Sequence, residues 1–282
     1  TEPRGMNMAL KILHSGRRKT EQNTVTYEHG NTDSLTQFAY GKFPIDYALN
    51  FAGLTLSLEL KTGLYNYKRA LGDWKTEINV SIDGGLMMIH PVEPLNLPDN
   101  LTDFLEINFD PIKIEPSGKC VVFVTMPIEI GIFLESTSGS VDILDIVSYV
   151  YPKYSLYGSS NRGVITRVHK SKVYYMPPSV KNYEAGLLKL EIQNRSSDWV
   201  TVGRVIIYQK GLSLYYDDEF VSASAEMTII SPDVAVVTGI DSPLRPEMYP
   251  SNKLFKNRKT SAFYNVPGML SDASYTMDMG LI

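Results

Sequence analysis

The stretch 53-GLTLSLELKTGLYNYKRALGDWKTEINVSI-82 decides the fold, because apolar and polar residues alternate along nearly all of it. In 53–60, leucines alternate with threonine, serine and glutamate, which places the leucines on one face of a half-buried strand. Turns at Gly63 and Gly72 separate this strand from two more with the same period. The stretch therefore predicts three consecutive β-strands. The sequence DGG at 83–85 predicts a hairpin after them, because consecutive glycines accept positive φ angles.

The same pattern continues through the rest of the chain. Alternating or β-branched runs such as "CVVFVTMP", "IEIGIFLES", "GLLKLEIQN", "WVTVGRVIIY" and "VSASAEMTII" are separated by glycine, proline and asparagine breakers at short, regular spacing. Residues 141–149 are the one stretch that could form a short helix, yet they are rich in valine and isoleucine. No alternation of strands and helices is visible, which argues against a doubly wound sheet. We predict an all-β protein built from antiparallel β-sandwiches of the Ig-like kind.

Breakers and composition divide the chain into four predicted parts. Residues 1–43 are weakly patterned and form an N-terminal arm, and residues 241–282 hold several prolines and form an extended C-terminal segment. Between them lie a sandwich at 44–150 and a second sandwich at 151–240, although one continuous sandwich would fit the same pattern. The C-terminal segment carries Met, Tyr and Phe, so it either packs along the body or docks to a partner.

Composition excludes several classes of protein. The net charge of −4 gives no support to nucleic-acid binding, which needs a concentrated basic surface. The single cysteine, Cys120, cannot form an internal disulfide and fits a reducing compartment. No run approaches the roughly 20 apolar residues of a membrane-spanning helix. We expect a soluble, cytoplasmic protein that would reach a membrane only through a partner.

One basic loop, 157-YGSSNRGVITRVHK-170, is the best candidate for a ligand site. Arg162, Arg167, His169 and Lys170 could together contact a small anionic ligand. A phosphate cradle, however, needs a glycine turn between a strand and a helix, and here Gly163 is followed by Val164 and Ile165, which continue as a strand. The alternative interpretation, a loop that only leads into a β-strand, is therefore favoured.

Other catalytic and metal signatures are missing from the sequence. The four histidines are scattered, no Gly-x-Ser-x-Gly elbow occurs, and Asp217, Asp218 and Glu219 lack the spacing of a calcium loop. We predict no catalytic residue, no metal and no cofactor. Aromatic clusters are more suggestive, because tyrosine is enriched at recognition surfaces. The tyrosines predicted to form a protein interface are Tyr151, Tyr154, Tyr157, Tyr174 and Tyr175.

Several phrases in this order resemble one family. They are "IHPVEPLNLP", "MPIEIGIFLES", "PKYSLYGSSNRGVITRVHKSKVY" and "LEIQNRSSDWVTVGRVIIY", and the resemblance covers roughly residues 44–250. The family is an archaeal one, the domain-of-unknown-function family numbered 432, which has segments similar to HPVEPVNLP, FPVEIGVF and PKYTLYG. The resemblance implies an archaeal, soluble protein and an association with membrane mechanosensitive channels of the small-conductance type. It supplies no activity and no catalytic residues.

Three hypotheses follow. The first is a non-catalytic β-sandwich that serves as an interaction or regulatory module with a protein partner, which the resemblance suggests to be a membrane channel. The second is a binder or hydrolase of a small anionic ligand that uses the loop at 158–170. The third is a structural or surface-layer protein, with glycosylation sequons at Asn79, Asn100 and Asn194. The oligomeric state is not predicted.

Overall fold

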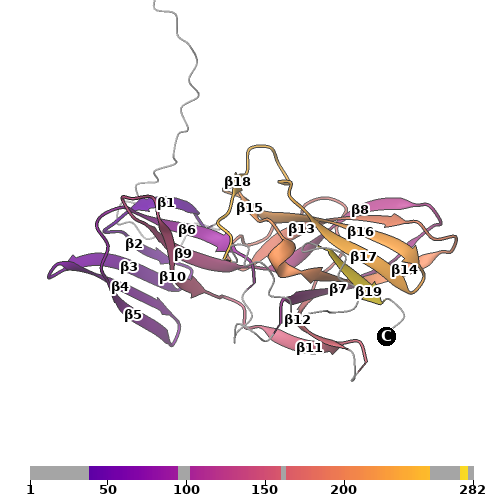
Figure 1. Ribbon diagram of the computed structural model, residues 1–282, viewed down its shortest axis with the longest axis horizontal. Helices are drawn as coiled ribbons and strands as arrows, with labels where there is room; N and C mark the ends of the chain where they lie inside the picture. Colours follow the sequence, from indigo (N-terminus) through magenta and orange to yellow (C-terminus); the bar gives the residue numbers. More distant parts are fainter. Residues whose placement is uncertain (1–37, 95–101, 160–162, 255–273, 279–282) are drawn as a thin grey trace, which may run out of the picture.

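The computed structural model describes residues 38–94, 102–159, 163–254 and 274–278. All regular structure in these ranges is β-strand, apart from one 3-10 turn, η1, at Gln209–Gly211. The all-β prediction is therefore confirmed. The strands form two bodies that lie side by side along the longest axis (Figure 1).

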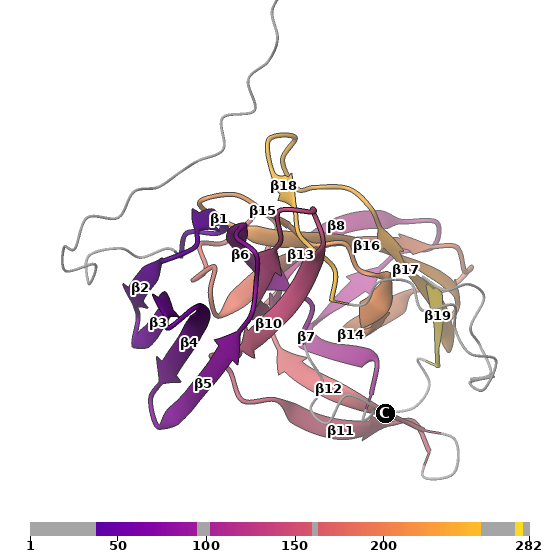
Figure 2. The same cartoon turned by 60° about the vertical axis from the view of Figure 1, so that its left-hand side comes forward.

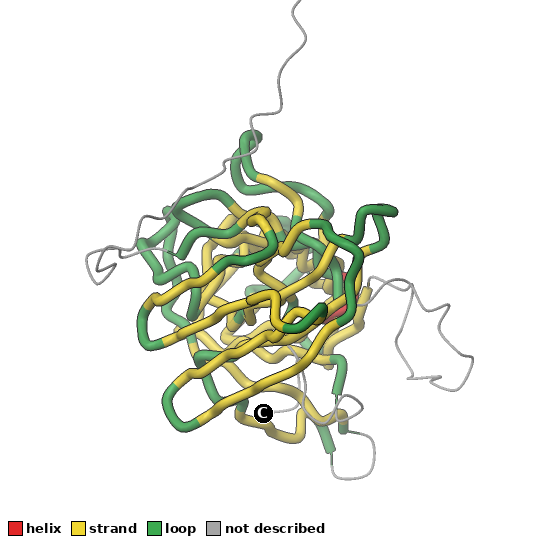
Figure 3. The backbone as a smooth tube through the Cα atoms, turned by 90° about the vertical axis from the view of Figure 1, so that its left-hand side faces the viewer, coloured by secondary structure: helices red, strands yellow, loops and turns green. Residues whose placement is uncertain are grey.

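The first body consists of two four-stranded sheets, with the strand orders β1-β6-β9-β10 and β2-β3-β4-β5. Leu54, Leu56 and Leu58 point into its core, as their alternation predicts, and meet Ile130 and Ile132 of the other sheet. Figure 3 views this body from its end and shows strands in more than one layer. Its strands are β1 (Gly41–Pro44), β2 (Ala48–Phe51), β3 (Leu54–Lys61), β4 (Leu64–Leu71), β5 (Trp74–Val80), β6 (Leu86–Val92), β9 (Glu129–Glu135) and β10 (Val141–Val147).

The second body has one sheet in the order β11-β12-β7-β14, and a larger sheet in which β18-β15-β16-β13-β8 is extended by β17 and β19. Leu105 and Ile107 of the smaller sheet share a core with Val122 and Leu190 of the larger one. Figure 2 shows the β11–β12 hairpin at the lower edge of this body. Its strands are β7 (Phe104–Ile114), β8 (Lys119–Pro127), β11 (Lys153–Tyr157), β12 (Val164–Lys170), β13 (Ala185–Asn194), β14 (Val200–Tyr208), β15 (Tyr215–Tyr216), β16 (Val221–Ser231), β17 (Val234–Ile240), β18 (Tyr249–Pro250) and β19 (Ser274–Asp278).

Most neighbouring strands are antiparallel, but β12 pairs with β7 and β13 pairs with β16 in parallel. Parallel partners cannot be joined by a tight turn, so each pair is formed by segments far apart in the chain. The strand β10, Val141–Val147, occupies the stretch that could have formed a helix. Its β-branched residues pair with β9, in agreement with their preference for sheets.

The prediction of a hairpin at 83–85 is wrong. The preceding strand β5 pairs with β4, whereas the following strand β6 pairs with β1 and β9, so DGG connects two different sheets. The glycine at 85 is needed for another reason: a Cβ atom there would lie 1.9 Å from the carbonyl oxygen of Glu135. True hairpins occur at the two earlier turns, where Gly63 and Gly72 adopt positive φ angles.

The two cores divide the chain differently from the predicted boundary near residue 150. Strands β7 and β8 precede that boundary, yet they belong to the second body, while β9 and β10 return to the first. Ile128 is the only residue between β8 and β9, so the chain passes from one body to the other without a linker. The bodies are thus interleaved along the chain.

Hydrogen bonds of a buried asparagine connect the start of the first body with the segment directly before β13. Asn182 is fully buried; its Oδ1 accepts a hydrogen bond from the Phe38 backbone N–H at 2.6 Å, and its Nδ2 donates to the Phe38 carbonyl at 2.8 Å. The hydroxyl of Tyr40 donates to the Asn182 carbonyl at 2.8 Å. Neighbouring Tyr183 packs in the core of the first body.

Both predicted arms contribute strands where the structure describes them. Strand β1 begins at Gly41, inside the predicted N-terminal arm at 1–43, whose first 37 residues lie outside the described ranges. Within the C-terminal segment at 241–282, β18 pairs with β15, and β19 pairs with β17. These two parts of the segment therefore pack along the second body, which was one of the two expected outcomes.

Candidate functional site

The most buried ion pair of the described residues lies between the two bodies. Arg167 on β12 donates from Nη1 to Oε1 of Glu129, the first residue of β9, at 2.6 Å. The side chains of Arg167 and Glu129 are only 2% and 1% exposed. Because β12 belongs to the second body and β9 to the first, the pair links the two bodies at the point where the chain crosses between them.

The described residues of the predicted basic loop, His169 and Lys170, do not join Arg167 at one surface. The His169 ring lies on the same side of β12, with Nε2 2.9 Å from the Thr125 hydroxyl. Burial, followed by the charge of Arg167, lowers the His169 pKa to about 4, so the ring is neutral at pH 7. Lys170 is exposed and follows on the opposite face of the strand. Arg162 lies outside the described residues.

The glycine-containing loop between β11 and β12 joins the two strands of a β-hairpin. Strands β11 and β12 pair antiparallel, with Tyr157 opposite Val164. Gly163 donates its backbone N–H to the Ser159 carbonyl at 2.6 Å, and a Cβ atom on Gly163 would approach that oxygen to 2.6 Å. The glycine is therefore explained by close backbone packing, as expected of a loop that leads into a strand.

The five predicted interface tyrosines separate into different environments. Tyr157 is buried in the second core, Tyr154 is half-buried, and Tyr174 is half-buried and forms an isolated bridge with Phe123. Tyr151 and Tyr175, in contrast, are 81% and 73% exposed. Only these two present most of their surface to solvent.

Tyr175 lines a groove together with Trp199, which the sequence did not single out as an interface residue. The groove has a volume of about 250 Å³ and lies where the β7–β8 hairpin approaches the start of β14. Trp199, which is 65% exposed, lines it together with Tyr175. We call it the end groove, and its lining is Ile112, Lys113, Ile114, Glu115, Gly118, Lys119, Cys120, Tyr175 and Trp199.

The thiol in the end groove is unreactive in character. Cys120 is half-buried, and burial raises its pKa, so it stays protonated near neutral pH. Trp199 was missed because a single tryptophan before a strand is also compatible with a core position. Its position directly after the polar segment Asn194–Asp198 was the one available signal of exposure.

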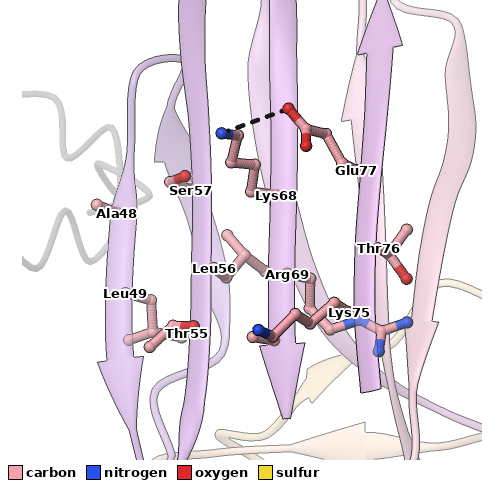
Figure 4. A pocket seen from close by; sticks show the side chains of 11 residues that line it. Ala48, Leu49, Thr55, Leu56, Ser57, Lys68, Arg69, Lys75, Thr76 and Glu77 are labelled. Atoms are coloured by element: carbon pink, nitrogen blue, oxygen red, sulfur yellow. Dashed lines mark ion pairs between the residues drawn. The ribbon is translucent and has the colours of Figure 1, made fainter. Parts of the chain in front are cut away.

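A second hollow, of about 530 Å³, lies on the outer face of the β2–β5 sheet (Figure 4). Short side chains such as Ala48 and Ser57 leave space above the strands, and Lys68 and Glu77 pair across it at 3.3 Å. Both partners of this pair are about half exposed. Arg69 also lines the hollow, but its guanidinium is engaged by Asp145 at 2.9 Å.

A match to a family model spans nearly all of the described structure. The family is described as "Protein of unknown function (DUF432)", and its model matches residues 39–276. The chain belongs to the DUF432 family. The comparisons with curated proteins and with solved structures each gave no significant match.

The family match has a structural consequence for this DUF432 chain. It begins just before β1 and ends within β19, so it includes both bodies rather than one of them. The interleaving of the strands explains why: neither core can form from one continuous half of the chain. The DUF432 unit is therefore the two-body structure as a whole.

Two absences among the described residues of this DUF432 chain bear on its chemistry. They contain no group of three or more histidine, cysteine, aspartate or glutamate side chains placed to hold a metal ion. They also contain no helix with the length and apolarity needed to cross a membrane. Asp217 accepts hydrogen bonds from the backbone N–H groups of Glu219 and Phe220, and Arg245 pairs with its carboxylate at 3.4 Å.

Proposed function

We propose that this DUF432 chain is a non-catalytic interaction or regulatory module, with two Ig-like β-sandwiches that present the end groove to a protein partner. The observation that supports this proposal best is the pairing of Tyr175 and Trp199 in one groove while both stay largely exposed. Large exposed aromatic side chains beside a groove are characteristic of interaction sites, because they bury much area on binding and keep a polar tip.

The lining of the groove suggests the character of the partner. Ile112, Ile114 and Cys120 provide an apolar floor, while Lys113, Glu115 and Lys119 supply charges of both signs. Such a site suits an apolar or aromatic side chain of a protein, held in the groove and surrounded by polar contacts. It does not suit a small anion, which needs a concentrated positive charge.

The anionic-ligand alternative receives less support. Arg167 is engaged with Glu129 in the interior, and His169 is neutral at pH 7 because of its lowered pKa. Lys170 alone would remain of the described members of the loop cluster. We therefore keep the interaction module as the proposed function.

The place of this module in the cell is part of the same proposal. The family resemblance suggests an archaeal, cytoplasmic protein that is accessory to a membrane channel complex. In such a complex the partner would be a cytoplasmic segment of the channel that inserts an apolar side chain into the end groove. The chain would then act at the membrane surface through that contact.

Truncation of Trp199 is the direct test of this surface. A partner recovered with the tagged wild-type chain from its native cells should bind Trp199→Ala about 30-fold more weakly, since aromatic anchors at such sites typically contribute about 2 kcal/mol. Titration calorimetry with the identified partner measures the change. Because Trp199 is largely exposed, the variant should keep its unfolding midpoint.

Trp74→Ala is the matched control. Trp74 is 72% exposed but lies on β5 of the first body, away from the end groove. We expect this variant to bind the partner with wild-type affinity. Equal affinity of all three proteins would contradict a role for the end groove.

A further inference from the structure

Residues 249–254 form a strap that runs from the second body onto the first. The strap begins as β18, which pairs with β15, and the backbone N–H of Ser251 donates to the Leu214 carbonyl at 2.8 Å. The Ser251 hydroxyl then donates to the carbonyl of Pro91 on β6. At its end Leu254 packs against an apolar cluster on the β1-β6-β9-β10 sheet that contains Met88, Val92 and Phe133.

The middle of the strap is held by a histidine that acts as an acceptor. The backbone N–H of Asn252 donates to Nδ1 of His90 at 3.2 Å, and Nε2 of the same ring lies 3.3 Å from the Tyr216 hydroxyl. An imidazole nitrogen that accepts a hydrogen bond carries no proton. The neutral ring must therefore hold its proton on Nε2, facing Tyr216.

A second proton on this ring is incompatible with the strap. It would place an N–H at Nδ1 directly against the N–H of Asn252, so that two donors face each other. Because His90 is buried, neither donor could gain a full set of water contacts in place of the lost hydrogen bond while the strap stays attached. The contact between β6 and the strap is therefore possible only with a neutral His90.

The surroundings of His90 favour the neutral ring near pH 7. Burial, followed by the charge of Lys42 on β1, lowers the His90 pKa to about 4, while Glu135 on β9 acts in the opposite direction. Lys42 and Glu135 form an ion pair with each other at 2.6 Å. The rings of Tyr216 and Phe133 that contact His90 are uncharged.

One acidic group also contacts the strap. Glu93 is buried and accepts a hydrogen bond at Oε2 from the backbone N–H of Leu254 at 3.2 Å. Burial raises its pKa, although the Leu254 contact and Lys253 act against this. Both contributions from the strap favour the charged carboxylate, so Glu93 is a second titratable group in contact with the strap besides His90.

We propose that residues 249–254 are an acid-releasable strap, in which a proton on Nδ1 of His90 displaces the Asn252 N–H, detaches the strap from the first body and uncovers Met88, Val92 and Phe133. The device depends on neither the end groove nor its partner. It links the C-terminal segment to the junction of the two bodies.

Hydrogen exchange of the Asn252 and Leu254 amides in the full chain tests the strap. In a Glu93→Gln background, which removes this second titration, the protection factors of these amides should fall about 30-fold between pH 7.5 and pH 5. This is the factor expected for a pKa near 4 in the attached state and near 6.5 in the released state. Amides of β13 serve as the internal reference for global unfolding.

Two variants assign the effect to the ring nitrogen. His90→Asn keeps an acceptor near the position of Nδ1 but does not titrate, so strap protection should become independent of pH. Asn252→Pro deletes the donor N–H, so the strap should exchange rapidly at both pH values; this variant remains informative if His90→Asn fails to fold. His169→Gln, at the other buried histidine, is the matched control and should leave the fall in protection unchanged.

The proposal would be overturned by strap amides in the Glu93→Gln protein that keep their protection at pH 5 while β13 is intact. A fall of equal size in His90→Asn would overturn it as well, because the response would then belong to another group.

Discussion

Replacement of Arg167 with methionine should lower the free energy of unfolding by about 3–5 kcal/mol, the largest effect we expect of any single substitution outside the apolar cores. The reason is Glu129, whose carboxylate would remain buried between the two bodies without the guanidinium that now lies 2.6 Å away. A buried carboxylate without its cation must either stay charged at a high desolvation cost or take up a proton. Urea denaturation at pH 7, followed by circular dichroism, measures the loss.

Two controls separate the burial of the charge from the loss of side-chain packing. The double variant Glu129→Leu and Arg167→Met replaces both charges with apolar groups and should recover most of the stability, since such replacements are often neutral. Arg69→Met breaks a more exposed pair, Arg69–Asp145 at 2.9 Å, and should cost less. A loss below 1 kcal/mol in Arg167→Met would contradict the assignment of the pair to the junction.

The second large effect is expected at Asn194, which should lose about 3 kcal/mol when replaced by alanine. Its Nδ2 donates to the carbonyls of Ile114, Glu115 and Asp198 at 3.2, 3.0 and 2.8 Å. Its Oδ1 accepts from the N–H and hydroxyl of Ser196. Because Asn194 is fully buried, the alanine variant would leave several polar groups without partners. Chemical denaturation of the purified variant gives the change.

Asn79 provides the matched comparison, because it begins another potential glycosylation sequon. It is exposed on edge strand β5 and accepts one hydrogen bond from Asn66, so Asn79→Ala should cost less than about 1 kcal/mol. A similar loss in both variants would show that Asn194 has no special structural role. The burial of Asn194 also weakens the surface-layer hypothesis, since a buried amide cannot carry a glycan; Asn100 lies outside the described residues.

The strands of this protein could be predicted from the sequence because the alternation of side chains is a local property. Leu54, Leu56 and Leu58 are buried as their period requires, and the turns at Gly63 and Gly72 form real hairpins. Pairing between sheets is not local. The DGG segment has the composition of a hairpin turn, but its strands are drawn to different sheets by contacts with β4 and β9.

The interleaving of the two bodies was hidden for the same reason. Nothing in the sequence of β8 indicates that it pairs with β13, from Pro127 opposite Ala185 to Lys119 opposite Gln193, while β9 directly after it pairs with β6. No turn or linker marks the crossing from one body to the other, because Ile128 alone separates β8 from β9. The predicted domain boundary, which follows the positions of turn-forming residues, therefore lies near residue 150, whereas the chain already crosses between the bodies at Ile128.

The candidate site could be predicted only in part. The aromatic content pointed to tyrosines, but composition does not reveal that Tyr157 is a core residue while Tyr175 is exposed. The basic loop looked like a set of available charges, yet the alternation along β12 sends Arg167 inward to Glu129 and Lys170 outward. His90 lies in no sequence motif that indicates its role. That role depends on its hydrogen bond with the strap, which is more than 150 residues away in the chain.

The central claim is that the end groove is the surface by which this DUF432 chain binds its partner. Site-specific photo-crosslinking tests it most directly, with a photoreactive phenylalanine analogue placed at Tyr175 in one protein and at Tyr151 in another. Both positions are highly exposed tyrosines, but only Tyr175 lines the groove. The account predicts that the partner recovered with the wild-type chain is crosslinked from position 175 and not from position 151. Crosslinking from position 151 alone, or equally from both positions, would contradict it.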